Sequence, residues 1–190
     1  MRKAIIVNCA LLIVNCLLLL AACNPVNPVS RTTYPQQFTS AWEERYGHCY
    51  DSIPYAVVAL DLYTDGLSLD TAERRMHGTG YNLYLSDIFV PADTLTPGEY
   101  KTITNNQSPI TPYTFLPGKD YEGTPHGMYL LYVENGQLQS IQLLDSGRFV
   151  MSDTADRLTD IRFTLYYTDA EGKAVTYDCA FQGELQWQKQ

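Results

Sequence analysis

The feature that most constrains the fold is the strict alternation of apolar and polar residues near the end of the sequence. In one run, Ile161, Phe163, Leu165 and Tyr167 alternate with Arg162, Thr164 and Tyr166, and in the next, Val175, Tyr177, Cys179 and Phe181 alternate with polar or small residues. A period of two places each set on one face of a β-strand. The short loop 169–172 joins the runs, so the sequence predicts a C-terminal antiparallel hairpin over 161–167 and 173–181.

Earlier segments predict further strands. Residues 55–63 form an apolar, β-rich run that ends at the turn signal Thr64-Asp65-Gly66, and residues 80–90 alternate until Pro91. Residues 128–134 and 137–145 flank Asn135-Gly136, which supplies the two positive-φ positions of a type I′ hairpin turn. A turn at Ser146-Gly147 then leads into a strand over 148–151.

Helical signals are few. Ser40-Ala41-Trp42-Glu43 has the spacing of a capping box, and Gly47 is placed to end a short helix, but the same residues also alternate as a strand would. Residues 153–160 suit a helical turn but have no apolar stripe. Strands without intervening helices favour antiparallel pairing. We therefore predict an all-β fold, an antiparallel β-sandwich or open barrel of about eight strands, with at most one short N-terminal helix.

The start of the chain carries a separate signal. Arg2 and Lys3 precede a long apolar stretch that ends in Leu20-Ala21-Ala22-Cys23. Only Cys23, and neither Cys9 nor Cys16, has small residues at both preceding positions. This pattern resembles the lipobox of bacterial lipoproteins, which implies a signal peptide over 1–22 and a lipid on Cys23. The alternative interpretation is an uncleaved transmembrane anchor.

The lipoprotein resemblance implies a cellular location. We expect a lipid-anchored protein of the cell envelope, with the membrane as a partner through its anchor. Asn24 favours the outer membrane, and because the first acidic residue is Glu43, the periplasmic and surface faces both stay open. Two prolines in a polar context predict a spacer over 23–38, followed by a single β domain over 39–190.

Strand-and-turn order over most of residues 45–187 extends the resemblance. The stretch from Gly80 through Pro97-Gly98-Glu99-Tyr100 to Tyr177 and Gly183-Glu184-Leu185 resembles a class of uncharacterised Bacteroidetes envelope lipoproteins. That resemblance implies a β-sandwich or open-barrel domain in the cell envelope. It carries no motif tied to a particular chemistry.

The net negative charge of the chain limits the kinds of partner that we expect it to bind. The chain has 13 Lys and Arg against 21 Asp and Glu. Removal of residues 1–22 takes away Arg2 and Lys3 and no acidic side chain. Nucleic acid and anionic membrane surfaces need basic patches, so we expect no nucleic-acid partner. The negative charge is suited to cations or basic partners.

Catalytic and metal signatures are missing from the sequence. There is no Gly-x-Ser-x-Gly motif, and His48, His77 and His126 have no ligand partner at the spacing that zinc sites favour. The acids between Asp153 and Asp160 lack the ligand ladder of an EF-hand loop. We therefore assign no catalytic residue, no cofactor and no metal.

Tyrosines and one loop are the candidate binding elements. The chain has 15 tyrosines, and Tyr84 and Tyr166 fall on strand faces opposite the apolar stripes. Residues 117–127 combine glycines, prolines, two acids, Tyr121 and His126, a composition typical of a binding loop or of a long hairpin connection. The candidate surface is Tyr84 and Tyr166 together with Tyr121 and His126.

Two cysteines remain in the predicted domain, Cys49 and Cys179. An oxidising compartment allows a disulfide between them. The alternative is that Cys179, in phase with Tyr177 and Phe181, is a buried apolar side chain.

Three functional classes fit these observations. The first is a non-catalytic envelope module that binds a glycan or a protein partner, because exposed aromatic rings on a rigid sheet suit capture. The second is a barrel-like carrier of a small apolar ligand. The third is a glycan hydrolase whose carboxylates come from distant strands. We favour the binding module.

Overall fold

The computed structural model describes residues 34–70, 72, 73, 75–103, 109–156 and 158–189. The predicted signal peptide, Cys23 and the first part of the predicted spacer lie outside the described residues. Residues from Pro35 onward form one compact unit. Gln37 and Phe38 belong to it, because they form β1 and pair with β15.

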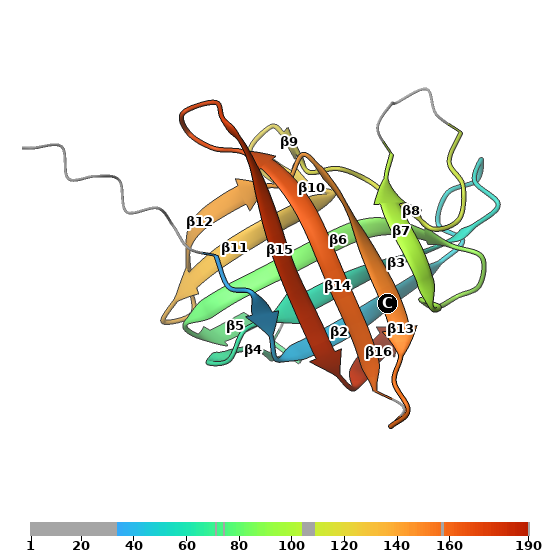
Figure 1. Ribbon diagram of the computed structural model, residues 1–190, viewed down its shortest axis with the longest axis horizontal. Helices are drawn as coiled ribbons and strands as arrows, with labels where there is room; N and C mark the ends of the chain where they lie inside the picture. The colour runs from blue at the N-terminus through green and yellow to red at the C-terminus, as the bar shows by residue number, and fades with distance from the viewer. Residues whose placement is uncertain (1–33, 71, 74, 104–108, 157, 190) are drawn as a thin grey trace, which may run out of the picture. The chain divides into compact units, whose positions relative to one another are not determined.

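The described part is all-β, and a curled sheet of 12 strands dominates it (Figure 1). The strands of this main sheet are β1 (Gln37–Phe38), β2 (Ser40–Gly47), β3 (Ala56–Tyr63), β6 (Gly80–Val90), β7 (Gly98–Thr102), β8 (Thr114–Phe115), β11 (Met128–Glu134), β12 (Gln137–Leu143), β13 (Ser146–Asp153), β14 (Thr159–Thr168), β15 (Ala174–Gly183) and β16 (Leu185–Lys189). Two hairpins form small separate sheets, β4 (Leu67–Asp70) with β5 (Arg75–Gly78) and β9 (Lys119–Tyr121) with β10 (Thr124–His126).

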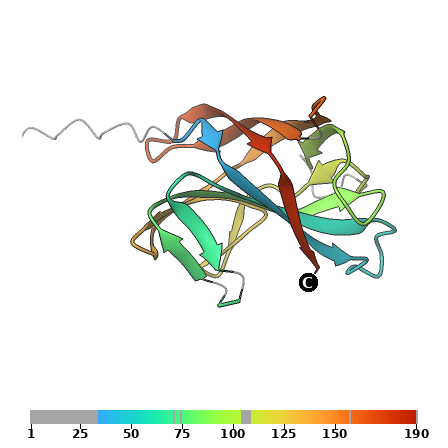
Figure 2. The same cartoon turned by 90° about the horizontal axis from the view of Figure 1, so that it is seen from below.

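The main sheet bends into a half-barrel with two facing layers. Its order is β1-β15-β14-β13-β7-β8-β6-β3-β2-β16, and β11 and β12 extend it from β6. The chain passes between the layers where β1 leads into β2 and where β15 leads into β16, as Figure 2 shows. At both places the strands pair in parallel, β1 with β15 and β16 with β2.

The structure corrects four details of the predicted fold. The main sheet has 12 strands rather than about eight, and it is mixed rather than antiparallel, since β7 and β8 also pair in parallel. The segment from Ser40 to Gly47 is β2 and not a helix, because it is paired with β3 on one edge and β16 on the other. Between β13 and β14, the described residues 154–156 and 158 form no helix.

The strands expected from alternation are present. β6 spans the predicted 80–90, and β14 and β15 form the C-terminal hairpin with continuous antiparallel register. Asn135 and Gly136 have φ angles of 51° and 74°, as the type I′ turn between β11 and β12 requires. Alternation predicts these strands because one face of each is buried.

Aromatic rings fill the space between the two layers. Phe149 of β13 is stacked on Tyr100 of β7, with ring centroids 4.4 Å apart and planes 9° apart. It also lies 5.4 Å from Phe163 and 5.5 Å from Phe115. β3 is buried at all eight positions, so its second face must be covered as well.

The β4–β5 hairpin covers part of that second face. Leu67 is buried with Tyr63 and Val133, and Trp42 and Met76 pack against this group.

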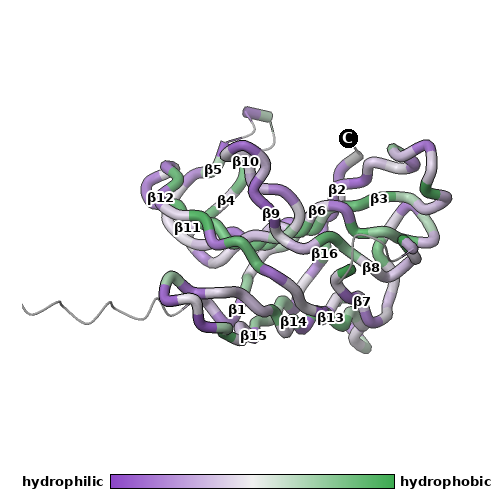
Figure 3. The backbone as a smooth tube through the Cα atoms, turned by 90° about the horizontal axis from the view of Figure 1, so that it is seen from above, coloured by the Kyte–Doolittle hydropathy of each residue, from purple (hydrophilic) through white to green (hydrophobic). Residues whose placement is uncertain are grey.

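Figure 3 shows the contrast in hydropathy between the apolar β3 and the hydrophilic β9 and β10. The part of the outer face that the hairpin leaves uncovered carries the candidate site.

Candidate functional site

The site is built around an irregularity in β6. One edge of β6 pairs with β11 up to Leu85 and with β8 from Ile88, so Ser86 and Asp87 lie where that edge changes partner. The register with β3 on the other edge also slips here, and Asp87 has a φ of 53°. This is a β-bulge, a feature that redirects side chains and is frequent beside active sites. A positive φ at a non-glycine residue is an uncommon conformation, often associated with function.

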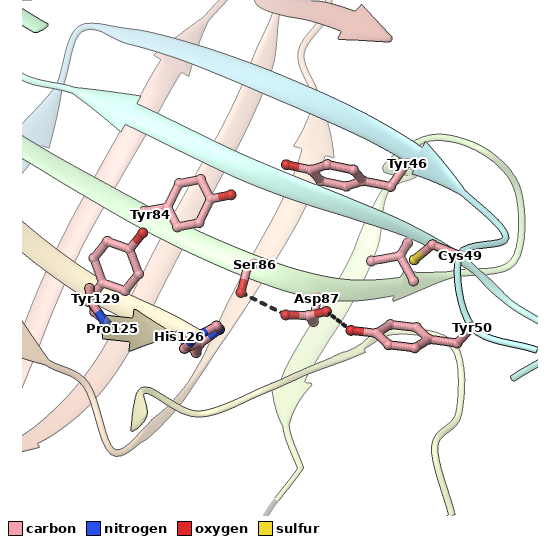
Figure 4. Close-up of a pocket in the computed structure, with 10 residues that line it drawn as sticks. Tyr46, Cys49, Tyr50, Tyr84, Ser86, Asp87, Pro125, His126 and Tyr129 are labelled. Atoms are coloured by element: carbon pink, nitrogen blue, oxygen red, sulfur yellow. Dashed lines mark hydrogen bonds between the residues drawn. The ribbon is translucent and has the colours of Figure 1, made fainter. Parts of the chain in front are cut away.

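A cavity of about 410 Å³ lies over the bulge, on the face of β6 opposite the core (Figure 4). Four tyrosines line it: Tyr46 at the end of β2, Tyr50 in the following loop, Tyr84 of β6 and Tyr129 of β11. The rings of Tyr84 and Tyr129 are 5.2 Å apart and tilted by 34°. The other lining residues are Cys49, Val57, Ser86, Asp87, Pro125 and His126.

Hydrogen bonds hold the Asp87 carboxylate in place. The Tyr50 hydroxyl donates to Oδ1 at 2.5 Å, and the Ser86 hydroxyl donates to Oδ2 at 2.8 Å. Ser86 Oγ in turn accepts a hydrogen bond from the Gly127 backbone N–H at 3.0 Å. A carboxylate has about four lone-pair positions, so Asp87 keeps capacity for a ligand.

The β9–β10 hairpin closes one side of the pocket. Gly127, directly after β10, has a φ of +75°, and a Cβ there would lie 2.0 Å from the Pro117 carbonyl oxygen, so the position requires glycine. Its carbonyl accepts a hydrogen bond from the Ser86 N–H at 2.9 Å. These contacts fix His126 at the pocket wall, and the Tyr121 ring meets His126 edge-on at 5.1 Å.

Two carboxylates lie behind the tyrosines. Asp61 of β3 is only 5 % exposed, and it accepts hydrogen bonds from the Tyr63 hydroxyl and from Asn82 Nδ2. Burial raises the pKa of Asp61 to about 7, and the nearby Glu44 charge adds to this rise. Glu44 accepts a hydrogen bond from the Tyr46 hydroxyl.

The pocket tyrosines stay protonated at neutral pH. Burial raises the pKa of Tyr46 to about 12, with the hydrogen bond to Glu44 as a further cause. It raises the pKa of Tyr129 to about 12 and raises that of Tyr84 as well. The pKa of Tyr50 is raised first by its hydrogen bond to Asp87 and then by burial. Each hydroxyl therefore keeps its proton, which Tyr46 donates to Glu44 and Tyr50 donates to Asp87.

The structure brings together three of the four predicted binding residues. Tyr84 and His126 line the pocket, and Tyr121 packs on His126. Tyr166 does not line the pocket. It lies on β14, opposite Ser146 of β13 and Thr176 of β15, and it is 42 % exposed.

Sequence reasoning did not assign Tyr46, Tyr50, Tyr129 or Asp87 to the site. One signal for the bulge is present in the sequence. The buried positions run through Leu83 and Leu85 and then resume at Ile88, an odd spacing that breaks the period of two. Such a slip indicates an extra residue in the strand, and it falls on Ser86 and Asp87.

Both cysteines of the described unit are free, so the structure does not contain the disulfide considered for Cys49 and Cys179. Cys49 is exposed at the pocket wall, and Cys179 is buried in β15. Desolvation raises the pKa of both thiols, that of Cys179 to about 12. Neither thiol is therefore activated as a thiolate nucleophile.

The arrangement of Ser86 and His126 does not form a nucleophile–base pair. Ser86 donates its proton to Asp87, and among the described residues no hydrogen bond joins it to His126. A serine nucleophile needs a base within hydrogen-bond reach. The pocket offers aromatic faces, hydroxyl donors and one oriented carboxylate, which are groups suited to binding.

A second cluster lies on the β4–β5 hairpin. One ligand atom each from Asp70, Glu73 and His77 falls within 4.8 Å of the others. Sequence spacing alone did not reveal it, because the hairpin brings the two ends of the segment together. The Asp70 carboxylate accepts hydrogen bonds from the backbone N–H groups of Ala72 and Glu73, so part of its capacity is already used by its own turn.

Comparison with models of known protein families, with curated proteins and with solved structures gave no significant match. The described residues include no helix with the length and hydropathy needed to cross a membrane.

Proposed function

We propose that this protein is a lipid-anchored binding module of the cell envelope, which captures a glycan in the tyrosine pocket and does not turn it over. The observation that carries the proposal is the convergence of Tyr46, Tyr50, Tyr84 and Tyr129 around a fixed carboxylate, Asp87. Sugar rings stack their C–H faces on aromatic side chains, and their hydroxyls bond to carboxylates and tyrosine hydroxyls. The cavity of about 410 Å³ is within the range typical of small-ligand sites.

Two observations favour this ligand class over the alternatives. The core of the curled sheet is packed with buried apolar side chains, among them the aromatic cluster around Phe149, whereas the pocket lies on the outer face. An apolar carrier would place its cavity inside the sheet. A hydrolase would need a second acid facing Asp87 across the pocket, but Asp87 is the only carboxylate among the lining residues described here.

The binding test uses the full chain in detergent and a set of neutral oligosaccharides of glucose, galactose and N-acetylglucosamine, with affinity measured by calorimetry. We expect Tyr84→Ala and Tyr129→Ala each to weaken the binding of the tightest oligosaccharide by about 1–3 kcal/mol, because both rings form the pocket wall. Tyr84→Phe keeps the ring and should retain most of the affinity.

Tyr166→Ala is the matched control for this test, since it removes an exposed tyrosine from a strand outside the pocket. It should leave binding unchanged. Equal loss in Tyr166→Ala and Tyr84→Ala would contradict the proposed site, and hydrolysis of the bound oligosaccharide that stops in Ser86→Ala would contradict a non-catalytic module.

The anchor is tested separately. If Cys23 carries the lipid, cells that express the chain should label it with radioactive palmitate, and Cys23→Ser should remove the label and leave an unprocessed form. Cys16→Ser is the control, because Cys16 follows Asn15 rather than a small residue, and it should still be labelled. Persistent labelling of Cys23→Ser would show that the lipid is elsewhere.

A further inference from the structure

The charges around the pocket are unbalanced. Asp87 lies in the pocket wall, and Glu44 and Asp61 lie directly behind Tyr46 and Tyr129. No Lys or Arg is among the lining residues that the structure describes. Asp87 and Glu44 therefore set the sign of the local field, and Asp61 adds to it only as it ionises near pH 7, so the field favours a positive group in the cavity.

Two basic residues lie on the β9–β10 hairpin. His126 lines the cavity, and Lys119 lies opposite it in the hairpin register without being a lining residue. Arg45, Lys101, Arg148 and Arg162 each form an ion pair with a carboxylate outside the pocket. Among the described lining residues, therefore, no arginine or lysine side chain lies beside Asp87.

The aromatic rings add to the attraction. The face of a tyrosine ring carries partial negative charge, so a cation within about 6 Å of the ring centre is stabilised, more strongly where water is displaced. Figure 4 shows the rings of Tyr46, Tyr50, Tyr84 and Tyr129 arranged around Ser86 and Asp87. A cation placed beside Asp87 would therefore meet both a carboxylate and aromatic rings.

We infer that the pocket selects a ligand with a positively charged amino or ammonium group, held by Asp87 and the surrounding tyrosine rings. This inference rests on the proposed function and specifies its ligand as a cationic, amino-bearing glycan. The strained Asp87 conformation is consistent with it, because two hydrogen bonds orient this carboxylate in a pocket whose described lining includes no Lys or Arg.

The test compares ligands of equal length and different charge by calorimetry on the full chain. The tetramer of glucosamine carries amines, and the tetramer of N-acetylglucosamine is neutral. We expect the glucosamine tetramer to bind about tenfold more tightly at pH 6, where its amines are protonated. A second pair, tetramethylammonium and the uncharged neopentyl alcohol, in which carbon replaces the ammonium nitrogen and one methyl group carries a hydroxyl, probes the cation without a sugar.

Asp87→Asn is the decisive variant, because asparagine also tolerates a positive φ and still offers an oxygen to Tyr50. It should remove the preference for the glucosamine tetramer, so that the two tetramers bind the variant with equal affinity. Asp156→Asn removes one exposed charge from a turn outside the pocket and should keep the preference, which separates a local effect from the net charge of the chain.

The outcomes distinguish the inference from the proposed function. Equal affinity for the two tetramers would overturn the inference and leave glycan binding intact. Binding of tetramethylammonium without binding of either tetramer would support the cation site and contradict the glycan module. Binding of none of these probes would overturn both, and a preference that survives Asp87→Asn would overturn the assignment to Asp87.

Discussion

The Asp61→Asn variant is expected to be more stable than the wild type at pH 8, by about 2–4 kcal/mol, and to lose this advantage near pH 4. Asp61 is 5 % exposed, and its pKa is raised by burial from 3.8 to about 7. Between these two pH values the folded protein holds a proton that the unfolded chain has released. Stability therefore falls as the pH rises from about 4 to 7, and the full cost of the buried charge is present above that range.

The magnitude follows from the same two pKa values. The difference between 3.8 and about 7 corresponds to about 4 kcal/mol at full ionisation. Asparagine keeps the shape and an acceptor oxygen for the Tyr63 hydroxyl without the charge, but it loses the hydrogen bond from Asn82 Nδ2, which lowers the gain below the full value of about 4 kcal/mol. Denaturant unfolding of both proteins from pH 4 to pH 8 measures the effect, and Asp156→Asn serves as an exposed control. A stability difference that does not change with pH would contradict the interpretation.

Phe149→Ala is expected to lower the free energy of unfolding by about 3–5 kcal/mol. The Phe149 ring is fully buried, stacked on Tyr100 at 4.4 Å and close to the rings of Phe115 and Phe163. Removing it leaves a cavity at the centre of the aromatic cluster, which neighbouring strands can fill only in part.

Val150 supplies the control for this prediction. It is the next residue of β13, its side chain lies on the opposite face, and it is 44 % exposed. Val150→Ala should change the unfolding free energy by less than about 1 kcal/mol. Denaturant unfolding measured by tyrosine fluorescence gives both values, and a loss for Phe149→Ala no larger than that for Val150→Ala would contradict the assignment of the core.

Alternation predicted the strands with one buried face, but it could not supply their partners. β16 and β2 pair although most of the sequence separates them. No local sequence pattern therefore encodes their parallel pairing or the closure of the curled sheet. The capping-box spacing at Ser40 was a real helical signal, but pairing of the same residues with two strands outweighs a local preference.

The sequence likewise predicts only part of the site. Alternation indicates the face of β6 that carries Tyr84, and the composition of its loop indicates His126. The same reasoning places Tyr166 with them, yet β14 lies in another part of the sheet order. Asp87 was missed because its importance depends on the bulge, where β6 exchanges β11 for β8.

The most direct test of the tyrosine pocket as the binding site is fluorine NMR of the full chain with 3-fluorotyrosine at every tyrosine position, assigned with Tyr→Phe variants. On addition of the glucosamine tetramer, we predict that the signals of Tyr46, Tyr84 and Tyr129 shift together with one binding curve. The Tyr166 signal should stay unchanged, because this residue lies outside the pocket. Shifts at Tyr166 without shifts at Tyr84 and Tyr129 would contradict the central claim.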